Sequence, residues 1–293
     1  RVIADNHIGD WGTQFGKLII AWREWRDECP ITDDPIGELQ WLYQQFGYRV
    51  DDNPSLIDRA RAETAKLQAG DPENRELWQQ FVDISLNEFD GVYQRLGIDF
   101  DVTHGESYYQ DALQPLIQRL QEAAIAVEDD GAVIIPFTSE DGKGLQKSPL
   151  LIRKSDGAAL YGTTDLATVE HRLETWQPDT IAYVTDVRQK LHFRQVFAAS
   201  RKMGHTVDFS HVWFGMLRFA DGAVASTRAG QVLNLVDVLD TAAQRAYQIV
   251  SEKSSDLNEE ERREIAEAVG LGAVKYADLS QNPQTDITFD WDR

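Results

Sequence analysis

The spacing of apolar residues predicts that the first third of the chain is mainly helical. Apolar positions recur three or four residues apart over residues 15–25 and again over residues 35–97. Within the longer region, Asp71 is expected to cap a helix whose first position is Pro72. The apolar face of the first helix consists of Phe15, Leu18, Ile19 and Trp22. The pattern therefore predicts one helix followed by a helical bundle.

Further along, short apolar runs alternate with helical patterns. Residues 180–185 are apolar and β-branched, as is typical of a strand in a parallel sheet. The other expected elements are strands over 98–102, 131–137, 150–153 and 211–215, a strand ending at Tyr161, and helices over 111–124, 163–175 and 191–203. From Leu235 on, the pattern is almost wholly helical, with a polar gap near Ser254. Such alternation of strands and helices indicates an α/β fold with a doubly wound sheet.

Both ends of the sequence interrupt an expected element. Residues 1–4 resemble the latter part of a strand, and the chain ends at Arg293 directly after an apolar-polar run. Natural termini more often carry small polar residues that fray. We therefore interpret the sequence as a fragment of a longer chain.

Composition and charge narrow the class of protein. The 293 residues are 42% hydrophobic and 27% charged, which is ordinary for a folded protein. A net charge of −20 argues against a generic polyanion binder, although local basic patches stay possible. Cys29 is the only cysteine, which excludes an intrachain disulfide and a Cys-rich zinc site. With no signal peptide and no long apolar run, a soluble, cytoplasmic protein is expected.

Candidate chemistry gathers where strands are expected to end. In open parallel sheets, ligands bind beyond the carboxyl ends of the strands. This rule selects residues 5–12, 161–165, 186–192 and 214–216 with the loop that follows. Each segment is polar or contains glycine, but each also has a purely structural interpretation.

Those alternatives differ from segment to segment. His7 and Asp10 form either an acid-base or metal pair or a turn over Trp11. Asp165, four residues after Tyr161, is either a ligand group or a charge near a helix start. Gln189 and His192 are either ligand groups or part of a solvated helix start. Ser226, Thr227 and Arg228 either bind phosphate or form a surface loop. The basic residues of 188–202 form either a basic patch or a solvated helix face.

Taken in order along the chain, these segments resemble arginyl-tRNA synthetases. The motifs that carry the resemblance are residues 7–16 (HIGDWGTQFG), 67–73 (LQAGDPE), 105–107 (GES), 160–166 (LYGTTDL), 188–193 (RQKLHF), 272–282 (GAVKYADLSQN) and 289–293 (FDWDR). The resemblance covers essentially the whole chain. It implies a class I synthetase Rossmann domain with an inserted α+β connective domain and a helical C-terminal extension.

The resemblance also implies boundaries and departures. The first half of the Rossmann domain would end over residues 1–24, and its second half would span 151–222. The connective domain would occupy 25–150, and the signature loop and helical connection 223–293. The HIGH signature would lie upstream of Arg1, and the D-loop-binding and anticodon-binding domains of the family have no counterpart here. Two further departures are Ser226, where many members carry a lysine, and Pro283 after Asn282, where an arginine is usual.

The activity that the resemblance implies is the ATP-dependent activation of L-arginine and its transfer to the 3′ end of tRNA(Arg). Mg²⁺ would arrive with ATP, with no protein-bound metal site, and the protein would be a monomer that binds no membrane. The implied site residues are Tyr161, Asp165 and Gln189 for arginine, His192, Phe214, Gly215, Met216 and Ser226 for ATP, Thr227 and Arg228 for catalysis, and Asn282 and Asp286 for the tRNA acceptor end. The isolated fragment is expected to be inactive. Two alternatives are a non-catalytic arginine-binding paralogue and a structural protein built on an inactive synthetase fold.

Overall fold

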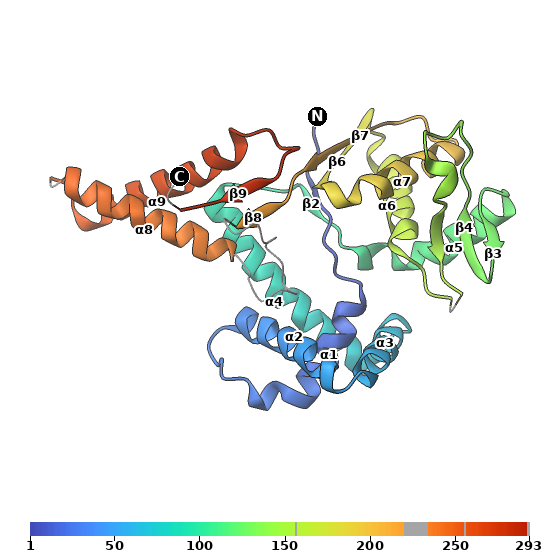
Figure 1. The fold of residues 1–293 in the computed structure, drawn as a ribbon, viewed down its shortest axis with the longest axis horizontal. Helices are drawn as coiled ribbons and strands as arrows, with labels where there is room; N and C mark the ends of the chain where they lie inside the picture. Colours follow the sequence, from blue (N-terminus) through green and yellow to red (C-terminus); the bar gives the residue numbers. More distant parts are fainter. Residues whose placement is uncertain (156, 220–233, 255, 292–293) are drawn as a thin grey trace. The chain divides into compact units, whose positions relative to one another are not determined.

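The computed structural model describes residues 1–155, 157–219, 234–254 and 256–291 (Figure 1). The chain divides into one unit of Arg1–Ser107 and another of Tyr108–Arg293. This division falls at a different place from the domain boundaries expected above, which stay a prediction. None of the helices in the described ranges is long and apolar enough to cross a lipid bilayer.

The first unit is a helical bundle with one short parallel strand pair. Its elements are β1 (Asp5–Asn6), α1 (Thr13–Trp25), the 3₁₀ turn η1 (Arg26–Glu28), α2 (Pro35–Asp52), α3 (Ser55–Gln68), α4 (Pro72–Leu96) and β2 (Val102–Thr103). The helices predicted for this region are confirmed. Ile19 and Phe81 are fully buried in one apolar cluster, and Leu42 and Phe46 are buried in a second. Amphipathic helices that close around two clusters explain the pattern in the sequence.

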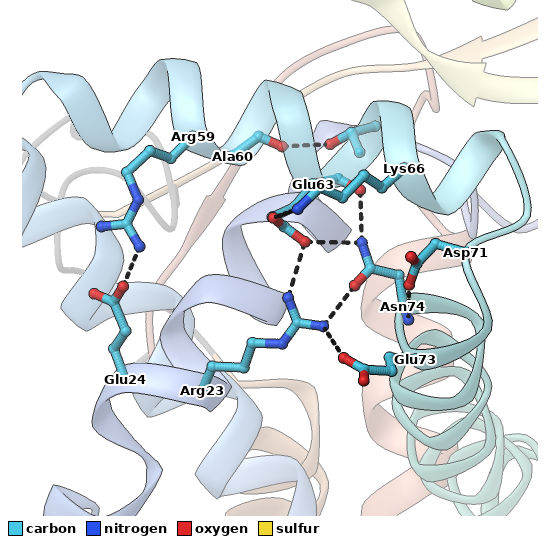
Figure 2. A network of polar contacts seen from close by, with 10 residues as sticks. Arg23, Glu24, Arg59, Ala60, Glu63, Lys66, Asp71, Glu73 and Asn74 are labelled. Carbon is cyan, nitrogen blue, oxygen red and sulfur yellow. Dashed lines mark hydrogen bonds and ion pairs between the residues drawn. The ribbon is translucent and has the colours of Figure 1, made fainter.

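A polar network around a buried asparagine joins α1, α3 and α4 (Figure 2). Asn74 is fully buried and donates through Nδ2 to the carboxylate of Glu63 at 2.9 Å. Arg23 donates to the Asn74 side-chain oxygen at 2.8 Å and to Glu63 at 2.9 Å. Burial alone would raise the pKa of Glu63, but hydrogen bonds from Lys66 and Asn74 outweigh burial and hold that pKa below its usual value. The network therefore keeps the partly buried Glu63 carboxylate charged.

The start of α4 confirms the predicted cap. The Asp71 side chain accepts a hydrogen bond from the Asn74 N–H at 3.0 Å, and Pro72 occupies the first helical position. At the other end, Gly97 takes the left-handed conformation with φ of 59°. A helix that begins at a capped proline and ends at glycine follows directly from the residue types.

The second unit contains the remaining strands. Its elements are η2 (Glu106–Tyr109, which begins before the unit boundary), α5 (Gln110–Glu122), β3 (Val127–Asp129), β4 (Ala132–Ile135), η3 (Leu145–Lys147), β5 (Leu150–Arg153), α6 (Tyr161–Trp176), β6 (Thr180–Asp186), η4 (Val187–Gln189), α7 (Lys190–Lys202), β7 (Asp208–Phe214), β8 (Leu217–Phe219), α8 (Leu235–Lys253), α9 (Glu259–Leu279) and β9 (Ile287–Phe289). β3, β4 and β5 form an antiparallel sheet, whereas β6 pairs with β7 and β8 with β9 in parallel. The buried core of this unit includes Leu166, Val169 and Val196.

Three expectations about strand ends were wrong. Tyr161 begins α6 and does not end a strand. The extended backbone stops at Leu160, which is the N-cap of α6 and makes no side-chain capping hydrogen bond. Near residue 100 only Val102–Thr103 form a strand, and at the start of the chain only Asp5–Asn6 do. These two strands pair with each other over two residues. Apolar alternation alone overestimated the length of both strands.

Candidate functional site

Three of the predicted site residues meet at the N-terminal ends of α6 and α7. Asp165 Oδ2 lies 2.5 Å from His192 Nε2, and the ring of Tyr161 contacts the His192 ring edge-on with centroids 4.7 Å apart. The side chains of Asp165 and His192 are 13% and 12% exposed. Tyr161 itself is 62% exposed. The site is thus a nearly buried carboxylate–imidazole pair beneath an exposed phenol.

The local sequence explains this arrangement. Tyr161 and Asp165 are four residues apart in α6, so their side chains share a helical face. His192 lies in the first turn of α7, which follows directly after β6 and η4. Because β6 and β7 run in parallel, their carboxyl ends meet at one edge. α6 also packs against α7, and this contact brings together two residues that are 27 positions apart in the sequence.

The hydrogen bond of the pair determines which ring nitrogen of His192 faces the carboxylate. A carboxylate accepts, so the proton on the His192 ring belongs on Nε2, which faces Asp165 Oδ2. His192 Nδ1 is buried and has no hydrogen-bond partner among the described residues. The other Asp165 oxygen, Oδ1, forms no hydrogen bond within the described part of the chain. The hydrogen bond from His192 therefore fixes the carboxylate through Oδ2, and lone pairs on both oxygens stay open to a ligand.

Gln189 is less closely integrated than the sequence predicts. It lies at the N-cap of α7 and is exposed. No hydrogen bond joins it to Tyr161 or Asp165 among the residues that the structure describes. Its role toward a ligand stays a prediction.

The floor of the site contains groups that the sequence analysis did not single out. Burial, reinforced by the negative charge of Asp165 and opposed by Arg172, raises the pKa of Tyr183. Tyr183 packs on Phe193 of α7 with ring centroids 4.6 Å apart. Alternate residues of β6 are buried, and this period-two pattern is the signal that could have identified Tyr183 as a core residue below the site.

His211 on β7 was also missed. Its Nε2 lies 2.8 Å from the Thr185 hydroxyl on the neighbouring strand. Burial, together with the positive charge of Lys190 and the nearby His192 ring, lowers the pKa of His211. The ring is therefore neutral near pH 7, and it shares a hydrogen bond with the Thr185 hydroxyl. Its place in an alternating strand was a signal for this role.

Gly215 and Met216, predicted for ATP, lie against the segment that contains Asn282 and Asp286, predicted for the tRNA acceptor end. The Gly215 N–H donates to the Pro283 carbonyl at 2.7 Å, and the Met216 N–H donates to Asp286 Oδ1 at 2.9 Å. Asn282 Oδ1 accepts from the Gln284 N–H at 3.0 Å. Ser226, Thr227 and Arg228 lie outside the described residues, and their predicted roles stay predictions.

The other segments favour their structural interpretations. The buried Asp10 carboxylate accepts from the Ser107 N–H at 2.8 Å and from its hydroxyl at 2.6 Å, so it joins two distant segments of the first unit. In residues 188–202, Arg188 pairs with Asp186, and Lys190 lies 3.8 Å from the centre of the Trp213 ring. Within the described ranges, no group of three His, Cys, Asp or Glu side chains could hold a metal ion.

Comparison with known proteins shows to which family this chain belongs. Residues 1–291 match the family model described as tRNA synthetases class I (R), catalytic domain. An arginine–tRNA ligase of Fusobacterium nucleatum is 46% identical over 292 residues, covering 100% of this chain and 50% of that protein. One of Chloroflexus aurantiacus is 43% identical over 297 residues, with the same coverage. The chain thus spans about half the length of the curated relatives it matches.

Solved structures give the same result for the fold. The arginyl-tRNA synthetase of Plasmodium falciparum superposes with a TM-score of 0.77 at 26% identity, covering 99% of this chain and 47% of that one. That of Thermus thermophilus has a TM-score of 0.75 at 20% identity, covering 100% and 54%. The expected α/β class I synthetase fold is confirmed.

Proposed function

Since this chain belongs to the family of class I arginyl-tRNA synthetase catalytic domains, we propose that the protein it forms part of is an arginine–tRNA ligase. Such a ligase activates L-arginine with ATP and transfers the arginyl group to tRNA(Arg). The observation that carries the proposal within this chain is the Asp165–His192 pair under Tyr161. Because the matched relatives are named ligases, the alternative of a non-catalytic arginine-binding paralogue is not supported.

Asp165 is the proposed contact for the guanidinium group of arginine. A carboxylate accepts two parallel N–H bonds from the planar guanidinium, a geometry that the ammonium group of lysine does not offer. His192 fixes the orientation of the carboxylate through Oδ2, and the exposed Tyr161 hydroxyl and Gln189 help to orient the substrate. Low exposure of the pair strengthens this charge-assisted contact by excluding water.

The proposed chemistry is nucleophilic displacement at phosphorus. A carboxylate oxygen of arginine attacks the α-phosphorus of ATP, the bond to the bridging oxygen of the β-phosphate breaks, and pyrophosphate leaves with that electron pair. A ribose hydroxyl at the tRNA 3′ end then attacks the arginyl carbonyl and releases AMP. The protein contributes positioning and charge stabilisation, with Mg²⁺ bound to ATP.

A second group of site residues is proposed to bind ATP. The Phe214–Met216 backbone and His192 border the adenosine, and Ser226, Thr227 and Arg228 approach the phosphates. Arginine and hydroxyl side chains suit this role because they bind phosphate oxygens through charge-assisted hydrogen bonds. These assignments rest on the resemblance of the residues to the family motifs.

The proposal is tested by arginylation of tRNA(Arg) with the full-length protein. Asp165→Ala should lower kcat/KM for arginine by at least about 100-fold, because the guanidinium loses a charged acceptor in a nearly buried site. Glu174→Ala, which removes an exposed carboxylate from the same helix, is the matched control and should leave kcat/KM unchanged. A wild-type protein that fails to arginylate tRNA in the presence of ATP would refute the proposed function.

A further inference from the structure

The segment after β7 is held by a turn from a distant part of the chain. β7 ends at Phe214 and β8 begins at Leu217, so Gly215 and Met216 lie between two strands. Hydrogen bonds from both residues reach residues 282–287, which lead into β9. We call this set of contacts the Met216 junction. β8 and β9 continue from it side by side as a parallel pair (Figure 1).

Gly215 is required by the close approach of the two backbones. A Cβ atom at Gly215 would lie 2.2 Å from the Thr285 carbonyl oxygen and 2.7 Å from the Asp286 nitrogen. Both neighbours are main-chain atoms, which cannot move aside as a flexible side chain can. The Gly215 N–H completes the contact by donating to Pro283 O at 2.7 Å.

Asp286 uses both carboxylate oxygens in the Met216 junction. Oδ1 accepts from the Met216 N–H at 2.9 Å, and Oδ2 accepts from Arg218 Nε at 2.7 Å. These two donors hold the pKa of Asp286 below its usual value, so the carboxylate is charged near pH 7. The Ile287 N–H donates to the Met216 carbonyl at 2.9 Å, so both main-chain polar groups of Met216 are bound by this segment.

Asn282 is committed to the shape of the same turn. Its side-chain oxygen accepts from the Gln284 N–H, and its carbonyl accepts from the Thr285 N–H at 3.1 Å and hydroxyl at 2.9 Å. The acceptor groups of Asn282 and Asp286 are therefore engaged within the protein. This bonding gives both residues a role other than the contact with the tRNA acceptor end that the sequence predicts.

We propose that Asp286 is a positioning residue for ATP: through the Met216 junction it holds the Phe214–Met216 backbone in the conformation that receives the adenosine. This inference rests on the proposed function, which assigns the adenosine to that backbone. Two residues between strands have no sheet partners of their own to order them. The junction supplies that order from the opposite end of the second unit's sequence.

The test measures the steady-state constants of the full-length enzyme for all three substrates. Asp286→Ala should raise KM for ATP about tenfold. Without the carboxylate the Phe214–Met216 backbone is no longer ordered before ATP binds, so ATP binding must supply the free energy of ordering it. KM for arginine and for tRNA should stay within about twofold of wild type. Asp286→Asn, which retains an acceptor for the Met216 N–H but loses the charge that holds Arg218, should give a smaller increase in KM for ATP.

Controls separate this proposal from a general loss of structure. Glu264→Ala removes an exposed carboxylate from α9 and should leave all three constants unchanged. Gly215→Ala disrupts the Met216 junction from its other side and should reproduce the ATP defect of Asp286→Ala. Should Asp286→Ala fail to fold, Asp286→Asn and Gly215→Ala still decide the question.

The contrary result is equally specific. A rise in KM for tRNA with unchanged constants for ATP would make Asp286 a tRNA contact and overturn the proposal. Calorimetric titration with ATP alone provides a readout that needs no catalysis, and Asp286→Ala should weaken ATP binding about tenfold there as well. A wild-type protein that binds ATP without arginylating tRNA would therefore refute the proposed function while leaving this inference testable.

Discussion

At the scale of single residues, the site depends on which partner each polar group finds. The resemblance predicts Asp165 as the arginine contact, and the structure adds that His192 binds one of its oxygens. Nothing in the spacing of two residues 27 positions apart reveals that hydrogen bond. The sequence likewise gives no sign of the partners of Asp286, because Met216 and Asp286 are 70 residues apart. Residue types predict candidate chemistry, whereas their pairing depends on tertiary structure.

His211 makes stability depend on pH. Its pKa in the folded protein is lowered from 6.5, so the unfolded chain binds the proton first as the pH falls. The free energy of unfolding should therefore decrease as the pH falls below about 6.5. In His211→Phe this decrease should be smaller, although His205, whose pKa burial also lowers, still contributes.

Urea unfolding at about pH 7.5 and about pH 5.5 checks this prediction. The quantity compared is the loss of unfolding free energy between the two pH values in wild type and in His211→Phe. Equal losses in both proteins, or a wild type that becomes more stable in acid, would contradict it.

At the scale of elements, amphipathic periodicity was a reliable guide to the helices. α2, α3 and α4 lie where the pattern placed a helical region, and Asp71 caps α4 as predicted. The misjudged boundaries share one cause, which is that main-chain contacts rather than side-chain types set them. Leu160 starts α6 without a side-chain cap, and β1 and β2 pair over only two residues.

The packing of α1 on α3 leads to a prediction about two helical glycines. A Cβ atom at Gly16 would lie 2.0 Å from the Ala60 carbonyl oxygen, whereas one at Gly47 meets nothing within 4 Å. Gly16→Ala should lower the free energy of unfolding by about 1–3 kcal/mol, because α1 and α3 must separate. Gly47→Ala, the matched control in α2, should raise it by about 0.5–1 kcal/mol.

Chemical denaturation of the two variants provides the measurement. The opposite signs of the two effects separate close packing from helix propensity, since both substitutions improve propensity alike. If both variants were stabilised, α1 and α3 would not approach as closely as the structure indicates.

At the scale of the whole molecule, the sequence motifs identified the family, and the structure shows on which helices, strands and loops those motifs lie. The expected class I fold is confirmed, while the division at Ser107 and Tyr108 was not foreseen from composition. Motifs show which residue types stand at a site. They do not show where along the chain the contacts between segments become sparse, and that is where the two units divide. The net charge of −20 is consistent with few basic surfaces, and two basic side chains of residues 188–202, Arg188 and Lys190, contact Asp186 and Trp213.

The central claim is that Asp165 receives the guanidinium group of arginine, and calorimetric titration of the full-length protein with L-arginine tests it most directly. Wild type should bind arginine much more tightly than L-lysine, and Asp165→Asn should weaken arginine binding about 100-fold, since the neutral amide cannot accept the bidentate charged contact. Unchanged arginine affinity in a folded Asp165→Asn protein would contradict the account.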